Sequence, residues 1–131
     1  MLDGKPIELI LVKNPSGFRL ALLSFAKKSA ARMIAINDNY ADGRDMSWLW
    51  DVDFSTLKSV AMVSGVRAYD MALRLQYDDV NIKQVEQRLD KALDIFLAEN
   101  KDMPKQIFCS YTAMMTLRTL LSKKTKVEKI R

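Results

Sequence analysis

The sequence of 131 residues predicts an α/β domain with a mostly parallel sheet of about five strands covered by helices. Short apolar segments rich in β-branched residues alternate along the chain with segments whose apolar residues recur at helical spacing. The short segments are apolar at nearly every position, which is typical of strands covered on both faces. A hydrophobic content of 49% and a charged content of 28% are those of an ordinary globular protein.

The first half of the chain should contain two strands and one long helix. Residues 7–12 form an apolar, β-branched run, and this strand should end before Pro15, since proline moves the preceding residue out of the helical region. A helix is expected from about residue 17 to residue 29, where apolar residues share one face. Residues 33–36 predict a second strand, which leads into a polar stretch of turn formers and then one helical turn at 47–50.

The second half of the chain continues this alternation. A third strand is expected at 59–63, a short fourth strand at 82–85 and a fifth at 106–110. Helices with one apolar stripe are expected over residues 67–77, 89–100 and 112–122. Because strands and helices alternate in this way, the sequence predicts a Rossmann-like sheet of mostly parallel strands.

One domain is expected over residues 1–122, followed by a basic tail over 123–131. The net charge is +5, and residues 118–131 hold six basic residues and one acidic residue, so the positive excess lies mainly in the tail. We interpret the tail as a solvated end and expect no nucleic-acid partner. A basic nucleic-acid module that uses the tail is kept as an alternative hypothesis.

The chain contains no His and a single Cys, and this composition excludes several kinds of chemistry. A domain without His has no Ser-His-Asp or Cys-His constellation of its own and supplies no imidazole to a metal. One Cys excludes an internal disulfide and a thiolate-rich zinc site, and Cys109 is expected to be an inert residue inside a strand. Four Gly residues permit neither a Walker loop nor a dinucleotide-binding motif.

Three polar loops, at residues 13–17, 37–47 and 64–67, should meet at one edge of the sheet, because each follows the carboxyl end of a strand. Five Asp residues fall within residues 38–53, which is more than turn formation alone explains, since neighbouring carboxylates repel one another. A magnesium site formed by Asp38, Asp42 and Asp45 is one interpretation of this Asp-rich loop, and turn and cap formation is the other.

Five further residues are candidates for function or for packing. Trp48 and Trp50 are interpreted either as core or lid residues or as part of a partner interface. Lys13 ends a buried strand where Ser, Asn or Gly is commoner, which suggests a functional role. Arg67 at a helix start should bind an anion or pair with the Asp-rich loop, and Arg74 should be a surface or ion-pair residue.

Residues 37–54 contain the string D-G-R-D-M-S-W-L-W-D-V-D-F, which is long and highly specific. Together with residues 11–18, 64–75 and 111–114, it resembles the carboxy-terminal domain of MurT, the Mur-ligase-like subunit of lipid II isoglutaminyl synthase. The resemblance covers residues 7 to about 121 and implies a Rossmann-like fold of the Mur ligase carboxy-terminal type.

The resemblance implies that this chain is one part of a two-subunit amide ligase and is inactive alone. A longer subunit would carry an upstream central ATP-binding domain, with ATP and Mg²⁺ bound there and no cofactor or metal expected in the isolated domain. The reaction implied is ATP-dependent amidation of the D-glutamate α-carboxylate of lipid II. Ammonia would come from glutamine, hydrolysed by a partner glutaminase subunit of the GatD type in the cytoplasm, at the inner face of the bacterial membrane.

The resemblance also implies roles for particular residues. The family supplies an Asp to the partner's catalytic triad, and we assign it to Asp45, with Asp42 as the second choice. The residues expected at the partner interface are Arg44, Trp48 and Trp50, and those expected to face nucleotide or substrate are Lys13, Asn14, Asp38 and Arg67. The alternative from another class is a self-contained, Mg²⁺-dependent phosphate-handling enzyme that uses the Asp-rich loop.

Overall fold

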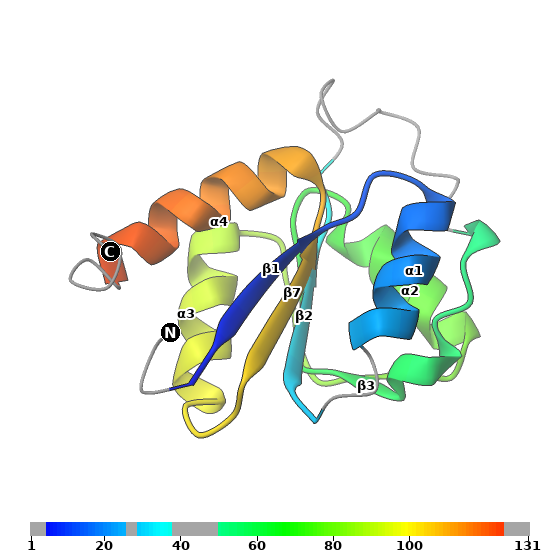
Figure 1. The fold of residues 1–131 in the computed structure, drawn as a ribbon, viewed down its shortest axis with the longest axis horizontal. Helices are drawn as coiled ribbons and strands as arrows, with labels where there is room; N and C mark the ends of the chain where they lie inside the picture. The colour runs from blue at the N-terminus through cyan, green and yellow to red at the C-terminus, as the bar shows by residue number, and fades with distance from the viewer. Residues whose placement is uncertain (1–4, 26–28, 38–49, 125–131) are drawn as a thin grey trace.

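A five-stranded parallel sheet runs through the middle of the domain in the computed structural model, which describes residues 5–25, 29–37 and 50–124 (Figure 1). Each strand pairs in parallel with its neighbours, which confirms the predicted α/β class. In spatial order the strands are β1 (Ile7–Leu11), β7 (Lys105–Cys109), β2 (Ala31–Ala35), β4 (Met62–Ser64) and β6 (Val85–Glu86).

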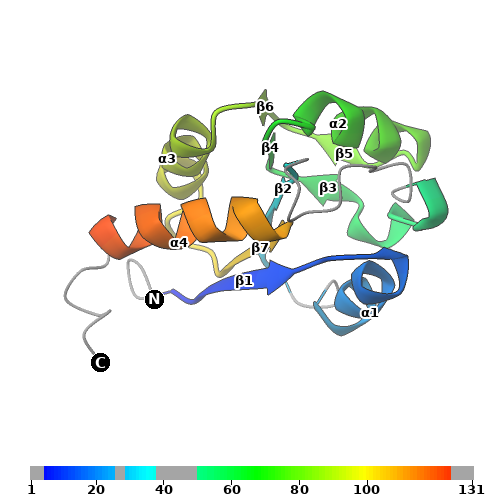
Figure 2. The same cartoon turned by 90° about the horizontal axis from the view of Figure 1, so that it is seen from above.

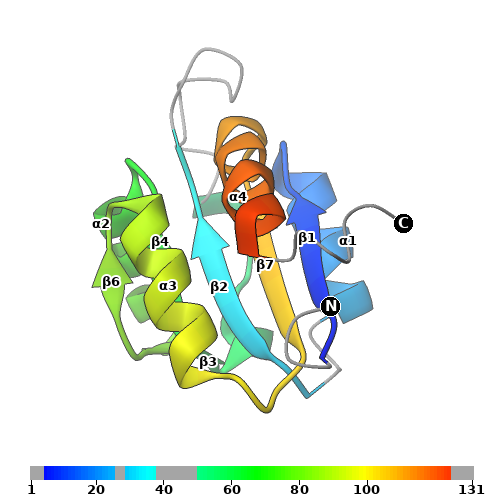
Figure 3. The ribbon, with the colours of Figure 1, turned by 90° about the vertical axis from the view of Figure 1, so that its left-hand side faces the viewer.

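Two helices cover each face of the sheet (Figures 2 and 3). Side chains on alternate positions of the strands point to opposite faces, so Ile34 and Phe108 belong to one core and Met33 and Ile107 to the other. The first core is closed by α1 (Pro15–Phe25) and α2 (Ala68–Tyr77), and the second by α3 (Leu89–Glu99) and α4 (Tyr111–Lys124). Within the described part of the chain, no helix is long and apolar enough to cross a membrane.

The predicted third and fourth strands are each divided in two, so the expectation of single strands at these places was wrong. Residues 59–63 are divided between β3 (Ser59–Val60) and β4. Of residues 82–85, the first belongs to β5 (Asn81–Ile82) and the last to β6. β3 and β5 form a separate two-stranded parallel sheet. The division occurs where Ala61 donates its backbone N–H to the carbonyl of Arg32 (2.8 Å), because the chain changes partner from β5 to β2 there.

The helix bounds differ from the predicted ones at both ends of the first helix and at the end of the last. The described part of the first helix ends at Phe25, and Ser29, its predicted end, is not helical. The first helix begins at Pro15, because the Asn14 Oδ1 atom accepts the N–H of Gly17 (2.8 Å) and caps the first turn, where proline is well tolerated. The last helix continues to Lys124, beyond the predicted end at Ser122. A short 3-10 helix, η3 (Ser55–Leu57), precedes β3.

Candidate functional site at the carboxyl edge of the sheet

The carboxyl ends of the strands form one edge, as the sequence predicted. The register places Leu11, Cys109, Ala35 and Ser64 in a single row across four strands. The strands β1, β2 and β4, which precede the three polar loops, therefore end at the same edge. This edge is therefore where we describe the candidate site.

Asn37 is the central polar residue of this edge. Its backbone N–H donates to the hydroxyl of Ser110 (2.9 Å), and its Nδ2 group donates to the hydroxyl of Thr112 (3.2 Å). Its Oδ1 atom accepts the N–H of Val66 (3.0 Å). One buried residue, through its backbone and its side chain, thereby joins the ends of β2 and β7 to the start of α4 and to the turn before α2.

The turn between β4 and α2 approaches the end of β2 very closely. Gly65 has a φ of +97°, and a Cβ atom placed on it would lie 2.3 Å from the carbonyl oxygen of Ile36. The same oxygen accepts the backbone N–H of Arg67 (2.9 Å). Only glycine permits this approach, so the turn brings the two strand ends together at a fixed distance.

The loop after β1 places Lys13 and Asn14 at the same edge. Lys13 is exposed. Asn14 is also exposed, but its side-chain oxygen is occupied by the helix cap on Gly17. The nucleotide- or substrate-facing role assigned to both residues stays a prediction. Capping of α1 alone explains the position of the Asn14 side chain.

The Asp-rich loop begins and ends next to residues that the structure describes, but most of the loop lies outside the described residues. Asp38, Asp42, Arg44, Asp45 and Trp48 lie outside the described residues, and so does the magnesium site that the first three Asp of the loop would form. The loop begins directly after the buried Asn37 and ends before the segment 50–54. The structure therefore defines the two ends of this loop.

Arg74 on α2 holds the segment that follows the loop. Its guanidinium donates to the carbonyl oxygen of Val52 and forms an ion pair with Asp78 (2.9 Å). The Asp78 carboxylate in turn accepts the N–H of Phe54 (2.8 Å). Arg74 is 6% exposed, so the surface interpretation was wrong and the ion-pair interpretation is confirmed.

Aromatic rings complete the attachment of segment 50–54. The guanidinium of Arg74 lies 5.2 Å from the ring centroid of Trp50 and 5.3 Å from that of Phe54, distances at which cation–π attraction operates. Phe54 packs edge-on against Phe18 of α1, with centroids 4.9 Å apart. The segment thus lies between α1 and α2 and is anchored to both.

The charged groups near this edge are mostly paired or hydrogen-bonded. Arg67 forms an ion pair with Asp70 in the next turn (3.1 Å), and its expected anion-binding role stays a prediction. The N–H of Ser55 donates to Asp53 (2.9 Å) and lowers the pKa of that carboxyl. Among residues 5–25, 29–37 and 50–124, no three Cys, Asp or Glu side chains come together as metal ligands would.

Cys109 lies inside the sheet and cannot serve as a nucleophile there. Its side chain is fully buried, and burial raises the pKa of the thiol to about 12. The thiolate fraction near pH 7 is therefore negligible. This confirms the expectation of an inert interior residue.

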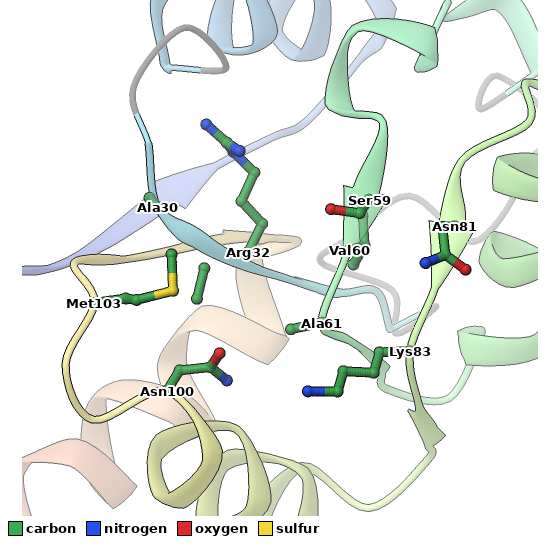
Figure 4. Close-up of a pocket in the computed structure, with 10 residues that line it drawn as sticks. Ala30, Arg32, Ser59, Val60, Ala61, Asn81, Lys83, Asn100 and Met103 are labelled. Carbon is green, nitrogen blue, oxygen red and sulfur yellow. The ribbon is translucent and has the colours of Figure 1, made fainter.

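A pocket of about 340 Å³ opens at the opposite, amino edge of the sheet (Figure 4). Arg32 lines it, but its guanidinium donates to Gln106 Oε1 (3.0 Å) and to the carbonyl oxygen of Phe25 (3.1 Å), which ends α1. Burial lowers the pKa of this Arg. The pocket holds none of the predicted site residues, and the Arg32 guanidinium in it serves the packing of α1.

Sequence reasoning did not single out Asn37, Ser110 and Thr112, or the anchoring role of Arg74. An Asn directly after the apolar run 33–36 was a usable signal, since a polar side chain at a buried strand end must find partners. The partners themselves lie more than 70 residues away along the chain, beyond the reach of local patterns.

Comparison with known proteins gives one family and several relatives. A family model described as MurT ligase C-terminal matches residues 11–114. The subunit MurT of lipid II isoglutaminyl synthase (glutamine-hydrolyzing) from Streptococcus pneumoniae (strain ATCC BAA-255 / R6) is 31% identical over 135 aligned residues, which cover 98% of this chain. The subunit of the same name from Staphylococcus aureus (strain COL) is 32% identical over 131 residues, covering 92% of this chain. The chain spans 30% and 29% of the lengths of these two relatives.

Proposed function

The chain belongs to the family of MurT ligase C-terminal domains, and we propose that it completes the glutaminase site of a partner subunit within a lipid II isoglutaminyl synthase. The names of the relatives contain the words synthase, glutamine-hydrolyzing and subunit, which supports a reaction carried out by more than one polypeptide. In this proposal the domain contributes a carboxylate, and the partner, a glutaminase of the GatD type, contributes the nucleophile and the base.

The composition supports this division of chemistry between two chains. Glutamine hydrolysis by nucleophilic catalysis needs an activated thiol or hydroxyl and a base that takes its proton. This chain has no His, and its one thiol is buried with a pKa of about 12. The catalytic Cys and His are therefore expected on the partner.

The anchoring of the Asp-rich loop at both ends is the observation that carries the proposal. Asn37 is held by Ser110, Thr112 and the turn before α2 at one end. Segment 50–54 is held by Arg74 at the other. Asp45 is five residues from Trp50, so its Cα atom lies within about 18 Å of that anchor even in a fully extended chain.

An Asp presented in this way can orient a histidine that belongs to another chain. Its carboxylate would accept the imidazole N–H, hold the ring in the tautomer that acts as a base, and stabilise the imidazolium formed when the nucleophile loses its proton. We assign this role to Asp45, with Asp42 as the second choice. Arg44 and Trp48 would contact the same partner.

ATP, bound together with Mg²⁺ by an upstream central domain, would supply the phosphoryl group that activates the D-glutamate α-carboxylate of lipid II. This domain has four Gly and no phosphate loop, which fits a supporting role. Lys13 and Arg67 are the cations that we expect, with Asn14 and Asp38, to face nucleotide or substrate. The reaction is proposed to occur in the cytoplasm, at the inner face of the bacterial membrane.

The test is Asp45→Asn in the complete two-subunit enzyme, with Asp42→Asn beside it and Asp102→Asn, an exposed residue at the opposite edge of the sheet, as a control. Asp45→Asn should lower the rate of glutamine hydrolysis by about 10² to 10⁴-fold, because asparagine favours the wrong imidazole tautomer. Amidation supplied with free ammonia should continue at an unchanged rate, since ammonia bypasses the glutaminase. Unchanged glutamine hydrolysis in both Asp45→Asn and Asp42→Asn would refute the assignment.

A further inference from the structure

The outer face of α2 carries large apolar side chains where a surface helix normally carries polar ones. α2 buries Ala68, Met71 and Leu75 against the sheet. Its exposed side nevertheless presents Tyr69, Leu73 and Tyr77, which are 62%, 50% and 71% exposed. Single exposed apolar residues are common, but a row of them marks an interaction surface.

These residues lie in one line along the helix. Val66 stands just before α2, and the steps from it to Tyr69, Leu73 and Tyr77 are three, four and four residues, the spacing of neighbours on one helix face. Trp50 continues the line, because its ring packs edge-on against Tyr77 with centroids 4.9 Å apart. We call Val66, Tyr69, Leu73, Tyr77 and Trp50 the α2 stripe.

The α2 stripe is held in place before any partner arrives. Arg74 is buried beneath it and lies 5.2 Å from the Trp50 ring centroid, so the indole is fixed between a cation and Tyr77. Binding to a pre-ordered aromatic surface costs little conformational entropy, and Tyr and Trp are the residues most enriched at energetically important interface positions.

We propose that the α2 stripe is the surface on which the glutaminase subunit docks; this inference rests on the function proposed above. The stripe ends at Trp50, five residues from Asp45. A partner whose histidine meets Asp45 must therefore approach within about 18 Å of Trp50. The same partner can then cover the whole stripe, because its other end, Val66, is hydrogen-bonded to Asn37, where the loop begins.

The charges beside the stripe indicate the chemistry of the partner surface. Asp51 and Asp53 follow Trp50 and are exposed, whereas the exposed Asp70 is paired with Arg67 (3.1 Å) and adds no net charge. An apolar centre with an acidic rim is complemented by an apolar helix or groove with Lys or Arg around it. We expect the glutaminase subunit to present such a surface next to its active site.

Hydroxyl-radical footprinting of the full-length subunit tests the surface without changing any residue. Tyr69 and Tyr77 should be oxidised readily in the subunit alone and several-fold more slowly after the glutaminase subunit is added. Met115 on α4 is 47% exposed on the other side of the sheet and serves as the internal control, with an unchanged rate. Equal rates for both tyrosines with and without partner would overturn the inference.

The other possible occupants of the stripe give a different footprint. Tyrosines already protected in the subunit alone would mean that the stripe is covered by the rest of the same polypeptide or by a second copy, and the inference would be wrong. Sedimentation of that sample separates the two cases, because only a second copy doubles the mass.

Leu73→Glu provides an independent measurement of partner affinity, with Met115→Glu as the matched control. Leu73→Glu should weaken binding of the glutaminase subunit at least tenfold at an unchanged melting temperature, while Met115→Glu should bind normally. Normal binding by Leu73→Glu would refute the docking surface. If Leu73→Glu fails to fold, the protection of Tyr69 and Tyr77 in the footprint tests the docking surface instead.

Failure of the docking surface can be told apart from failure of the proposed function. Normal binding by Leu73→Glu together with loss of glutamine hydrolysis in Asp45→Asn leaves the function standing and removes the surface. Weak binding by Leu73→Glu together with full hydrolysis in Asp45→Asn keeps the surface and removes the role of Asp45. A wild-type subunit that binds no glutaminase overturns both.

Discussion

Gly65 holds a backbone conformation and a close contact that a side chain would disturb. Its φ of +97° lies in the region that favours glycine, and a Cβ atom there would meet the backbone of Ile36 rather than a movable side chain. Backbone atoms in a packed sheet have little freedom to move away. The turn that carries Val66 and Arg67 therefore depends on this one residue.

We predict that Gly65→Ala lowers the free energy of unfolding by roughly 3 kcal/mol or more, since strain and overlap add. Urea denaturation followed by circular dichroism measures the change. Gly17→Ala is the control, because the atom nearest its new Cβ is the Asn14 Oδ1 at 3.3 Å, at the end of a side chain that can shift. That variant should change stability by less than about 1 kcal/mol. Equal effects of the two substitutions would contradict this account of Gly65.

The residues of the candidate site were only partly predictable from sequence. The string that contains Asp45 identified the family, and the family model agrees with that identification over residues 11–114. The roles of Asp45, Lys13 and Arg67 remain predictions. Asn37 could not be recognised as the residue that joins three elements, because its partners Ser110 and Thr112 are brought to it by the sheet and not by the chain.

Segment 50–54 is attached to the helices α1 and α2 through backbone and aromatic contacts, without belonging to the sheet. Arg19 of α1 donates to the carbonyl oxygen of Asp51, and Arg74 of α2 donates to that of Val52. Residues 50 and 51 are in 3-10 conformation, and the segment takes no part in the hydrogen-bond ladder of either sheet. Its position depends on a few long side chains, chiefly Arg74.

We predict that Arg74→Met destabilises the domain by about 3 kcal/mol, because the partly buried Asp78 carboxylate loses its cation and Val52 loses a hydrogen bond. Chemical denaturation gives the value. Arg88→Met is the matched control, since Arg88 pairs with Asp90 at the surface, where an ion pair contributes little to stability. A similar loss in both variants would show that Arg74 is no more than a surface residue.

The predicted elements correspond closely to the observed ones where the pattern is local. The helix with apolar residues at Leu89, Ala92, Leu93 and Phe96 was predicted over 89–100 and is observed as α3, Leu89–Glu99. The strand 59–63 was predicted as one piece because it is continuously apolar after Ser59. Its division at Ala61 is caused by a change of neighbouring strand, and no local pattern records which neighbour a strand will have.

The domain has two separate apolar cores, one on each face of the sheet, and Cys109 lies in the second. Its Sγ atom belongs to the core that α3 and α4 close, at the end of β7, an interior strand between β1 and β2. A reagent in solution therefore reaches the thiol only when the sheet or this helical layer opens. The thiol makes a natural probe of global unfolding.

We predict that iodoacetamide modifies Cys109 very slowly at pH 8 in the folded protein and rapidly in urea. Burial raises the pKa of this thiol from its ordinary 9.0 to about 12, so the folded state keeps the proton more tightly than the unfolded state. The resulting stabilisation is fully present below pH 9 and is lost as the pH rises toward 12. Mass spectrometry of the alkylated protein checks the rates. Rapid modification at pH 8 without denaturant would contradict the buried position.

The order of the strands has a consequence for how the protein is made. β1 lies beside β7, and Ile7 pairs with Lys105, a residue that the ribosome adds 98 positions later. At about 5–20 residues per second, the emerging β1 waits roughly 5–20 s for its neighbour. β2 also needs β7 on one side, so the middle of the sheet closes only after β7 has been synthesised. During that interval apolar strand edges stay open, and the nascent chain depends on late residues to bury its earliest ones.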